Sequence, residues 1–202
     1  MIVFRDIILR DFMESDIATR ITWETTETEW QLWDAPWEYD DLTDAQREEE
    51  LQRYIATMRK WVERYRNLPD SEVRSTFQIT LNNASRKYIG WCNSYNIDEN
   101  YESTCGDGWC TIGIDIPEMA ARGQGYAYQA WYAFICYLLE HGEENIYTQT
   151  WSGNTRMIHV AEKMGFEECH RKVGKRLVRG QVYDGLTFRL NLEKFQKFGQ
   201  NI

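Results

Sequence analysis

The sequence has few of the features that mark non-globular or membrane proteins. Only three of its 202 residues are proline and 13 are glycine, which excludes collagen, disordered chains and low-complexity arrays. No apolar run approaches the roughly 20 residues that a membrane helix needs, and the first residues lack the charged and apolar regions of a secretion signal. We therefore expect a soluble, cytoplasmic protein with no membrane partner.

The number of cysteines is small and odd. Five cysteines in a chain without a secretion signal are expected to be reduced thiols. Cys105 and Cys110 are close in sequence, but no second pair of Cys or His has the spacing of a metal site. The sequence therefore predicts no bound metal.

Positive charge is sparse, and the negative charge is concentrated in one segment. The chain carries 23 basic and 32 acidic residues, a net charge of −9. Nucleic acid is not an expected partner, because its binding requires clustered Lys and Arg. Between Glu24 and Glu50, eleven acids stand against one base and alternate with Trp30, Trp33, Trp37 and Tyr39. This acidic segment, residues 23–50, is either a solvated face or a lip that attracts a cationic ligand by electrostatic steering and cation–π contact.

Hydropathy patterns indicate one domain, residues 1–202, in which strands precede helices and then alternate with them. The clearest helix follows Thr43, which forms a capping box with Gln46, and ends near Asn67. Shorter helices are expected over 13–23, 123–140 and 154–164. Strands are expected over 5–10, 73–81, 87–95, 110–116, 146–150, 169–178 and 186–192. This order predicts an α/β fold (α+β, with a mixed sheet) flanked by helices.

The clearest candidate site is a strand that leads through a glycine-containing loop into a helix. After the strand, Arg122-Gly123-Gln124-Gly125-Tyr126-Ala127 opens an amphipathic helix. Glycine permits a sharp turn close to a ligand, and the first helical turn offers unpaired N–H groups and the positive end of the dipole. A phosphate or diphosphate site is therefore predicted at residues 122–127. The loop lacks the features of a Walker A or dinucleotide motif, and a glycine turn without a ligand is the alternative.

Two motifs resemble those of the GNAT superfamily of N-acetyltransferases. Arg122-x-x-Gly125-x-Ala127 is similar to its acetyl-CoA signature, Gln/Arg-x-x-Gly-x-Gly/Ala. The stretch from Asn154 to Gly165-Phe166 resembles its Asn…Glu-Lys-x-Gly-Phe segment. Trp33-Asp34-Ala35-Pro36-Trp37 resembles the RimJ/RimL-like branch, which acetylates ribosomal-protein N-termini. The resemblance implies the acyl-CoA N-acyltransferase fold, a mostly antiparallel central sheet splayed at the CoA site.

The resemblance also implies which residues hold acetyl-CoA. Beginning at Arg122, the loop is expected to bind the diphosphate through the amides of Gly123, Gln124, Gly125, Tyr126 and Ala127. The pantetheine arm is expected to pair like a strand with Ile114, Asp115 and Ile116, where a backbone N–H would hold the oxyanion. Asn154 either caps its helix or touches the pantetheine.

The chemistry requires a proton acceptor, since an alkyl ammonium with a pKa near ~10 must lose a proton before it attacks a thioester. Asp115 is a candidate base or relay, with Glu24 and Glu118 in plausible neighbourhoods. The positions that commonly carry the family's Tyr and Ser hydroxyls are Ala161 and Met157 here. Tyr126 is a candidate replacement, together with Tyr128 and Ser152. The histidines, of which His159 and His170 are expected at the surface, are given no catalytic role.

Two functions are compatible with these residues. The first is transfer of the acetyl group of acetyl-CoA to a primary amine of a cationic substrate, a small amine or a peptide N-terminus, by direct attack in a ternary complex. Glu24, Trp33 and Trp37 would bind this acceptor. The alternative is a CoA-binding module of the same fold with weak or no catalysis, suggested by Ala161 and Met157. The identity of the amine and the choice between monomer and homodimer are left open by the sequence.

Overall fold

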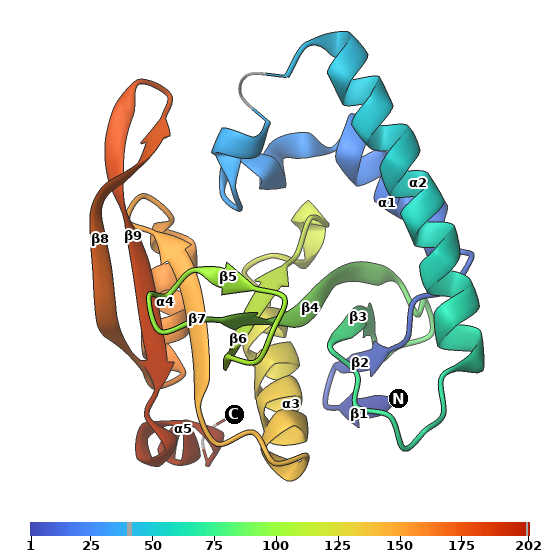
Figure 1. Cartoon of the computed structure of the whole chain (residues 1–202). Coiled ribbons are helices and arrows are strands. Elements are labelled where there is room, and N and C mark those ends of the chain that lie inside the picture. The colour runs from blue at the N-terminus through green and yellow to red at the C-terminus, as the bar shows by residue number, and fades with distance from the viewer. Residues whose placement is uncertain (40–41, 201) are drawn as a thin grey trace.

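The computed structural model describes residues 1–39, 42–200 and 202, and its centre is a nine-stranded sheet (Figure 1). Every pair of neighbouring strands is antiparallel except β6 and β7. The predicted α/β fold with a mostly antiparallel sheet is thus confirmed. The strands follow the order β1 (Ile2–Phe4), β2 (Ile7–Arg10), β3 (Thr76–Leu81), β4 (Tyr88–Ile97), β6 (Trp109–Asp115), β7 (Ile146–Trp151), β9 (Gln181–Leu190) and β8 (Phe166–Val178), with β5 (Ser103–Thr104) beside β4.

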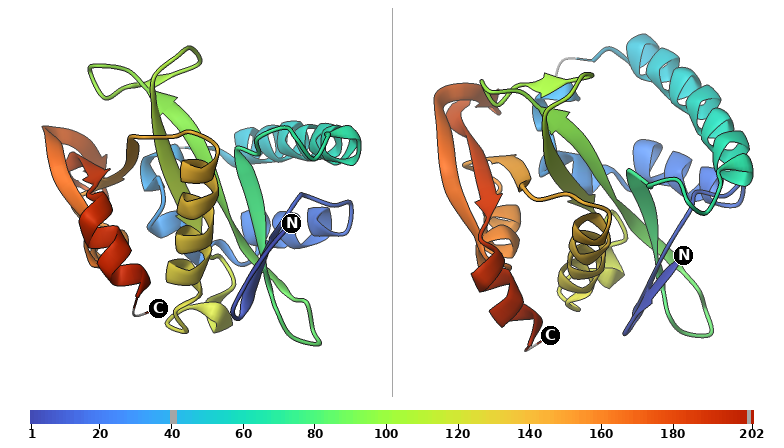
Figure 2. Two further views of the ribbon diagram at one scale, coloured as in Figure 1. Left: turned by 90° about the horizontal axis from the view of Figure 1, so that it is seen from below. Right: turned by 60° about the horizontal axis from the view of Figure 1, so that its bottom comes forward.

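Helices lie on both sides of this sheet (Figure 2). The main hydrophobic core joins one side of the sheet to α3 (Tyr126–Glu140), α4 (Thr155–Lys163) and α5 (Leu192–Gly199). On the other side, α1 (Asp16–Thr25) and α2 (Asp44–Asn67) enclose two smaller clusters, one of Trp23, Trp30, Tyr88 and Trp91 and one around Met58. Three short helices, η1 (Thr28–Leu32), η2 (Pro36–Glu38) and η3 (Met119–Ala121), lie in the connections. None of the helices in the described chain is long and apolar enough to span a membrane.

Several elements differ from the sequence prediction. The strand expected over 5–10 is a hairpin of β1 and β2, because Arg5 takes a positive φ of 47° and turns the chain. β8 begins at Phe166, directly after Gly165, and forms a long hairpin with β9. The helix α5 was not predicted, although Asn191 caps it by accepting a hydrogen bond from the amide of Lys194 at 3.2 Å. A short α5 contributes only two turns of apolar periodicity, so the pattern alone is weak.

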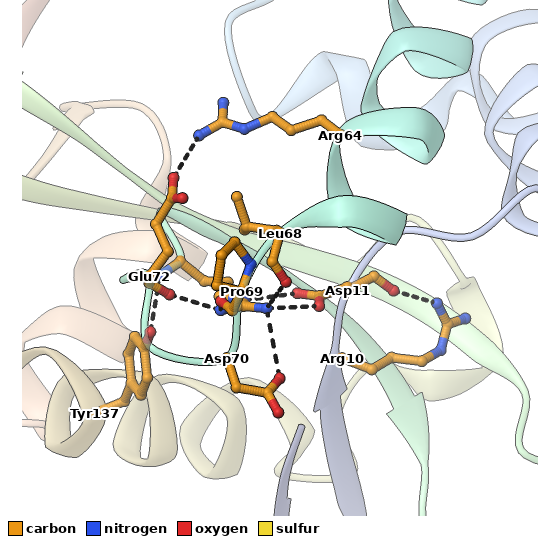
Figure 3. Close-up of polar contacts among 9 residues, drawn as sticks. Arg10, Asp11, Arg64, Leu68, Pro69, Asp70, Glu72 and Tyr137 are labelled. Carbon is orange, nitrogen blue, oxygen red and sulfur yellow. Dashed lines mark hydrogen bonds and ion pairs between the residues drawn. The ribbon is translucent and has the colours of Figure 1, made fainter.

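The predicted helix after Thr43 is confirmed, and its capping box with Gln46 is present. The far end of α2 is held by the buried guanidinium of Arg74, on which several groups converge (Figure 3). It donates to the carbonyls of Leu68, Pro69 and Glu72 and pairs with the Asp11 carboxylate at 3.4 Å. The amide of Arg74 also donates to the Tyr137 hydroxyl of α3 at 2.8 Å. These contacts fix α2 relative to the sheet.

Strands β6 and β7 diverge in the middle of the sheet. Their parallel pairing comprises Cys110 with Ile146, Thr111 with Tyr147 and Ile112 with Thr148. Beyond these pairs β6 remains bound to β4 as far as Asp115, and β7 remains bound to β9 as far as Trp151. Residues 113–115 and 149–151 therefore each turn one unpaired strand edge toward the other. The predicted splay of the sheet is present at this point.

Candidate active site

A cleft of about 1780 Å³ opens where β6 and β7 diverge. Its walls come from α1, the acidic segment, α2, the ends of β6 and β7, the start of α4 and the β8–β9 hairpin. Gln124, Gly125 and Tyr126 are not among its lining residues, and Tyr126 packs against the main core instead. Asp40 and Asp41 of the acidic segment lie outside the described residues. The predicted site residues that line the cleft are Glu24, Trp33, Trp37, Ile114, Asp115, Ile116, Arg122, Gly123, Ala127 and Asn154.

The loop before α3 has a backbone that favours glycine. Gly123 has a φ of 73° and Gly125 a φ of 81°, and a Cβ at either position would meet no atom within 4 Å. The left-handed backbone, not crowding, therefore explains the two glycines. Within the described chain the amides of residues 123–125 donate no hydrogen bond, and those of the first turn of α3 are free by helix geometry. This arrangement fits an anion such as a diphosphate.

The side chain of Arg122 is bound by the protein itself. Its Nε donates to the carbonyl of Ile116 at 2.8 Å, and one Nη forms an ion pair with Glu29 of η1. Glu29 also accepts a hydrogen bond from the indole of Trp33 at 2.8 Å and pairs with Arg156 of α4 at 3.4 Å. Burial by itself raises the pKa of Glu29, but the hydrogen bonds from Arg122 and Trp33 and the two arginine charges hold it below its ordinary value. The ionised carboxylate thus links the starts of α3 and α4.

Asn154 caps α4, which was one of the two predicted alternatives. Its Oδ1 accepts from the amide of Met157 at 3.1 Å. Its Nδ2 donates to the carbonyl of Trp33 at 2.7 Å, and the indole of Trp151 donates to the same carbonyl at 2.9 Å. The acidic segment is therefore tied to the end of β7 as well as to Arg122. A contact of Asn154 with pantetheine stays a prediction.

The tryptophans of the acidic segment are engaged by the protein's own cations. The Arg156 guanidinium lies 4.0 Å from the centre of the Trp33 ring, and that of Arg176 lies 4.0 Å from the centre of the Trp37 ring. Trp30 is 6% exposed and belongs to a buried aromatic cluster. One face of both Trp33 and Trp37 is therefore already covered, so the aromatic pattern alone does not support cation–π binding of a ligand.

Three carboxylates face the cleft beside the splayed strands: Glu24 of α1, Asp34 between η1 and η2, and Asp115 at the end of β6. Glu24 accepts a hydrogen bond from Gln31 at 3.1 Å. Among the described residues, none donates a hydrogen bond to the carboxylate of Asp34 or Asp115 or forms an ion pair with it. The Asp34 side chain is exposed to the solvent of the cleft. Within the part of the chain that the structure describes, Asp34 and Asp115 thus have no hydrogen-bond or ion-pair partner.

Burial followed by mutual repulsion shifts the titration of these groups. Burial and then the charge of Glu38 raise the pKa of Asp34 to about 6. Burial and then Asp34 raise the pKa of Asp115 well above its ordinary value, and burial raises that of Glu24. Carboxyl groups with raised pKa values are effective proton acceptors near neutral pH. Within the described chain no group of three His, Cys, Asp or Glu is arranged to hold a metal ion.

Sequence reasoning missed several residues of the cleft. Tyr39 packs beside Trp30, and burial, followed by the charges of Glu24, Asp34, Glu38 and Asp115, raises its pKa, so the phenol stays protonated at neutral pH. Asp34 lies within a quoted motif, but nothing in the sequence pairs it with Asp115. The expectation of a surface His170 was wrong. The ring is half buried and stacks on Tyr101 at 4.2 Å, because the β8–β9 hairpin places it in the wall of the cleft. Its buried Nε2 has no hydrogen-bond partner among the residues that the structure describes.

A sheet that splits beside a glycine-containing helix start, with carboxylates at the split, defines the class of acyl-CoA-dependent N-acyltransferases. The family model described as acetyltransferase (GNAT) domain matches residues 6–167. The chain belongs to this family and is an acetyl-CoA-dependent N-acetyltransferase. Among curated protein sequences none matches the chain.

Solved structures of several acetyltransferases have the same fold. An acetyltransferase of the GNAT family from Bacillus anthracis is 14% identical, with a TM-score of 0.64 over 95% of this chain and 98% of that one. A ribosomal-protein-S5-alanine acetyltransferase from Vibrio fischeri is 16% identical, with a TM-score of 0.63 over 93% and 94%. RimL, a ribosomal L7/L12 alpha-N-protein acetyltransferase in complex with coenzyme A, is 13% identical, with a TM-score of 0.62 over 93% and 95%. At these identities the likeness concerns the fold.

Proposed function

We propose that the protein acetylates a primary amine of a cationic acceptor by direct attack on acetyl-CoA in a ternary complex. The observation that carries this proposal is the pair of unpartnered carboxylates, Asp34 and Asp115, beside the split between β6 and β7. Among the described residues, none of the three carboxylates at this position forms an ion pair, and Glu24 alone accepts a hydrogen bond, from the neutral amide of Gln31. A positively charged ligand would supply the missing interaction.

Four basic residues of the cleft, in contrast, already form ion pairs within the protein. Glu29 pairs with Arg122 and Arg156, and Glu102 pairs with Lys172 and Lys175. These cations are therefore not free to bind an anionic acceptor without losing an existing partner. Because these four cations are paired and the carboxylates beside the split are not, a cationic acceptor is favoured.

On the other side of the split, the chain is proposed to hold acetyl-CoA. The amides of residues 123–127 would bind the diphosphate, and the free edge of Ile114, Asp115 and Ile116 would pair with the pantetheine arm. The left-handed glycines and the amides without acceptors support this assignment. When bound, acetyl-CoA supplies an acyl group activated as a thioester. A main-chain N–H at the end of β6 would stabilise the negative charge that develops on the carbonyl oxygen.

The acceptor chemistry follows from the carboxylates. Asp34 and Asp115 would attract the ammonium group, and Asp115 would accept its proton, directly or as a relay, so that the nitrogen lone pair can attack. Tyr39, whose phenol stays protonated, is positioned among these carboxylates and would donate a hydrogen bond to the departing thiolate. A thiolate leaves readily, so the absence of a hydroxyl at Ala161 or Met157 does not prevent turnover. A role for Tyr126 stays a prediction.

Two of the structural neighbours act on different kinds of acceptor. One is a spermidine N-acetyltransferase chimera from Vibrio cholerae, at 15% identity and a TM-score of 0.60, and another is the alpha-N-protein acetyltransferase RimL. A small polyamine and a peptide N-terminus both present a protonated amine. The test therefore has to contain both.

The experiment supplies acetyl-CoA with a panel of diamines, polyamines, aminoglycosides, short basic peptides and neutral or acidic amines, and follows the free thiol. We expect turnover with cationic acceptors and much less with acidic ones. No thiol release with any amine would contradict the proposed transfer, and a preference for acidic acceptors would contradict the role of the carboxylates.

A pair of variants separates specific binding from general attraction. Asp34→Asn is expected to raise the KM for a cationic amine about tenfold at any salt concentration, since it removes a carboxylate without a partner. Glu48→Gln, an exposed acid at the rim of the cleft, should raise KM at low salt only, because its effect is long-range and screened. If both variants changed KM in the same way, Asp34 would contribute only the long-range attraction of an exposed surface acid.

A further inference from the structure

A buried arginine with uncharged hydrogen-bond partners lies behind the carboxylates of the cleft. Arg20 of α1 is 3% exposed. Its guanidinium donates to the hydroxyl of Tyr88 at 2.6 Å, to the hydroxyl of Tyr54 at 3.0 Å and to Oε1 of Gln78 at 3.3 Å. Its Cζ lies 3.2 Å from the centre of the Trp91 ring. Three secondary-structure elements and an aromatic ring thus enclose one positive charge.

No carboxylate pairs with this charge among the described residues. Burial raises the pKa of both Tyr54 and Tyr88, so these two partners remain neutral at physiological pH. A buried cation without a counter-ion costs several kcal/mol of desolvation unless other charges compensate it. The carboxylate of Asp16, one helical turn before Arg20 on α1, already forms an ion pair with Arg10 at 2.6 Å. The compensation for Arg20 therefore has to come from another direction.

The carboxylates that can compensate the charge of Arg20 lie in the cleft. Glu24 lies one helical turn after Arg20 on α1, on the same face of the helix. Asp115 lies directly opposite Trp91 in the pairing of β4 with β6, and Trp91 is the ring that covers Arg20. Burial raises the pKa of Glu24 and Asp115, and the positive charge of Arg20 opposes that rise. The second cation that acts on Asp115, Arg122, is already paired with Glu29.

We propose that Arg20 is a positioning residue that keeps one of the two carboxylates Glu24 and Asp115 ionised at neutral pH. The inference rests on the proposed function, because only amine acetylation needs a proton acceptor here. Three carboxylates in one cleft repel one another, and each protonates more readily than it would alone. Arg20 offsets this repulsion from behind, where it cannot be displaced by the acceptor. In the step that follows, an N–H bond of the ammonium breaks, an O–H bond forms on the ionised carboxylate, and the electron pair stays on nitrogen.

The direct test uses carboxyl titration and needs no turnover. ¹³C-labelled Asp and Glu side chains are titrated by NMR in the wild type, in Arg20→Met and in Arg20→Lys. Arg20→Met is expected to move the cleft carboxyl titrations upward by about one pH unit, the effect of one unit charge at a distance of several ångströms. Arg20→Lys keeps the charge and should leave them close to the wild type. Unchanged titrations in folded Arg20→Met would overturn the proposal.

A second variant guards against loss of folding in Arg20→Met. Gln78→Glu is nearly isosteric and places a carboxylate on the guanidinium, so the arginine remains and its field at the cleft is cancelled. The expected titration shift is again upward, and no shift in this variant would also speak against the proposal. Gln78→Met, which removes the acceptor of the hydrogen bonds from Arg20 and Tyr88 without adding a charge, is the matched control and should leave the titrations unmoved.

Activity gives an independent readout. If a base in the cleft must be ionised, the acid limb of kcat/KM moves to higher pH in Arg20→Met by the same amount as the titrations. A uniform fall in kcat with an unmoved acid limb would show a merely structural role. Should the wild type acetylate no amine, the proposed function fails, but the titrations still decide whether Arg20 controls the carboxylates.

Discussion

The carboxylate of Glu29 forms an ion pair with the guanidinium of Arg122, the residue that opens the glycine-containing loop before α3. The same carboxylate reaches Arg156 at the start of α4. One residue of the acidic segment therefore neutralises two arginines near the proposed diphosphate site. A diphosphate that binds this loop would meet a fixed negative charge, and the two would compete for the same cations.

Glu29→Gln is accordingly expected to tighten the binding of coenzyme A. Removal of the carboxylate takes away repulsion and frees both arginines, so Kd should fall about fivefold at low salt and less at high salt. Isothermal titration calorimetry at two salt concentrations measures this. Glu27→Gln, an exposed acid two residues earlier, is the control and should change Kd little. Weaker binding in Glu29→Gln would instead show that Glu29 orients Arg122 for the ligand.

Gly125→Asp is expected to weaken binding of coenzyme A at least about tenfold, because it places a carboxylate beside the proposed diphosphate. Gly142→Asp is a matched control, since Gly142 also has a positive φ, 95°, and open space around its Cβ position. Both variants suffer similar backbone strain. Similar affinities for the two variants, measured by calorimetry on folded protein, would refute the assignment of the loop.

Asp34→Asn should stabilise the protein at alkaline pH. The pKa of Asp34 rises from an ordinary value of 3.8 to about 6 on folding, so the stabilisation that its protonated form gives is full below 3.8 and lost as the pH rises through 6. The side chain meets solvent in the cleft, which reduces the effect to about 1 kcal/mol at pH 8. Urea unfolding at pH 8 and near pH 4 checks this, with Asp107→Asn as an exposed control. A gain that is larger at the lower pH would contradict the direction of the shift.

Arg74→Met should cost about 3 kcal/mol of folding stability. The buried guanidinium satisfies three carbonyls and the Asp11 carboxylate, all of which lose a partner in the variant. Arg64→Met removes an exposed ion pair to Glu72 of 3.7 Å and should cost about 0.5 kcal/mol or less. Denaturant unfolding of both variants measures the difference. Equal losses would mean that the contacts around Arg74 contribute little.

The parts of the fold that depend on local signals were predictable. Thr43 and Gln46 predict the start of α2 because a capping box uses residues three positions apart. Gly123 and Gly125 indicate the loop before α3 because the positive φ at both positions favours glycine. The turn at Arg5 and the η1 and η2 helices escaped prediction, since neither has a distinctive periodicity and Arg5 is not a residue that usually takes a positive φ.

The candidate site was predictable only where it follows a motif. Residues of the acidic segment line the cleft, but composition could not show that Arg156 and Arg176 cover Trp33 and Trp37. Asp34 and Asp115 line the same cleft because of how the acidic segment lies relative to the end of β6, which no local pattern encodes. Such contacts arise from tertiary packing, and they decide which carboxylates have partners.

The divergence of β6 from β7 after three residue pairs has a consequence for ligand selection. The two facing strand edges, or rims, carry main-chain hydrogen-bond donors and acceptors. They favour binding of a molecule whose amide groups have the spacing of a β-strand. A bare nucleotide such as adenosine diphosphate could engage the turn before α3 but would leave both rims unsatisfied. The backbone itself therefore discriminates between coenzyme A and its nucleotide fragment, and a side-chain substitution cannot easily remove this preference.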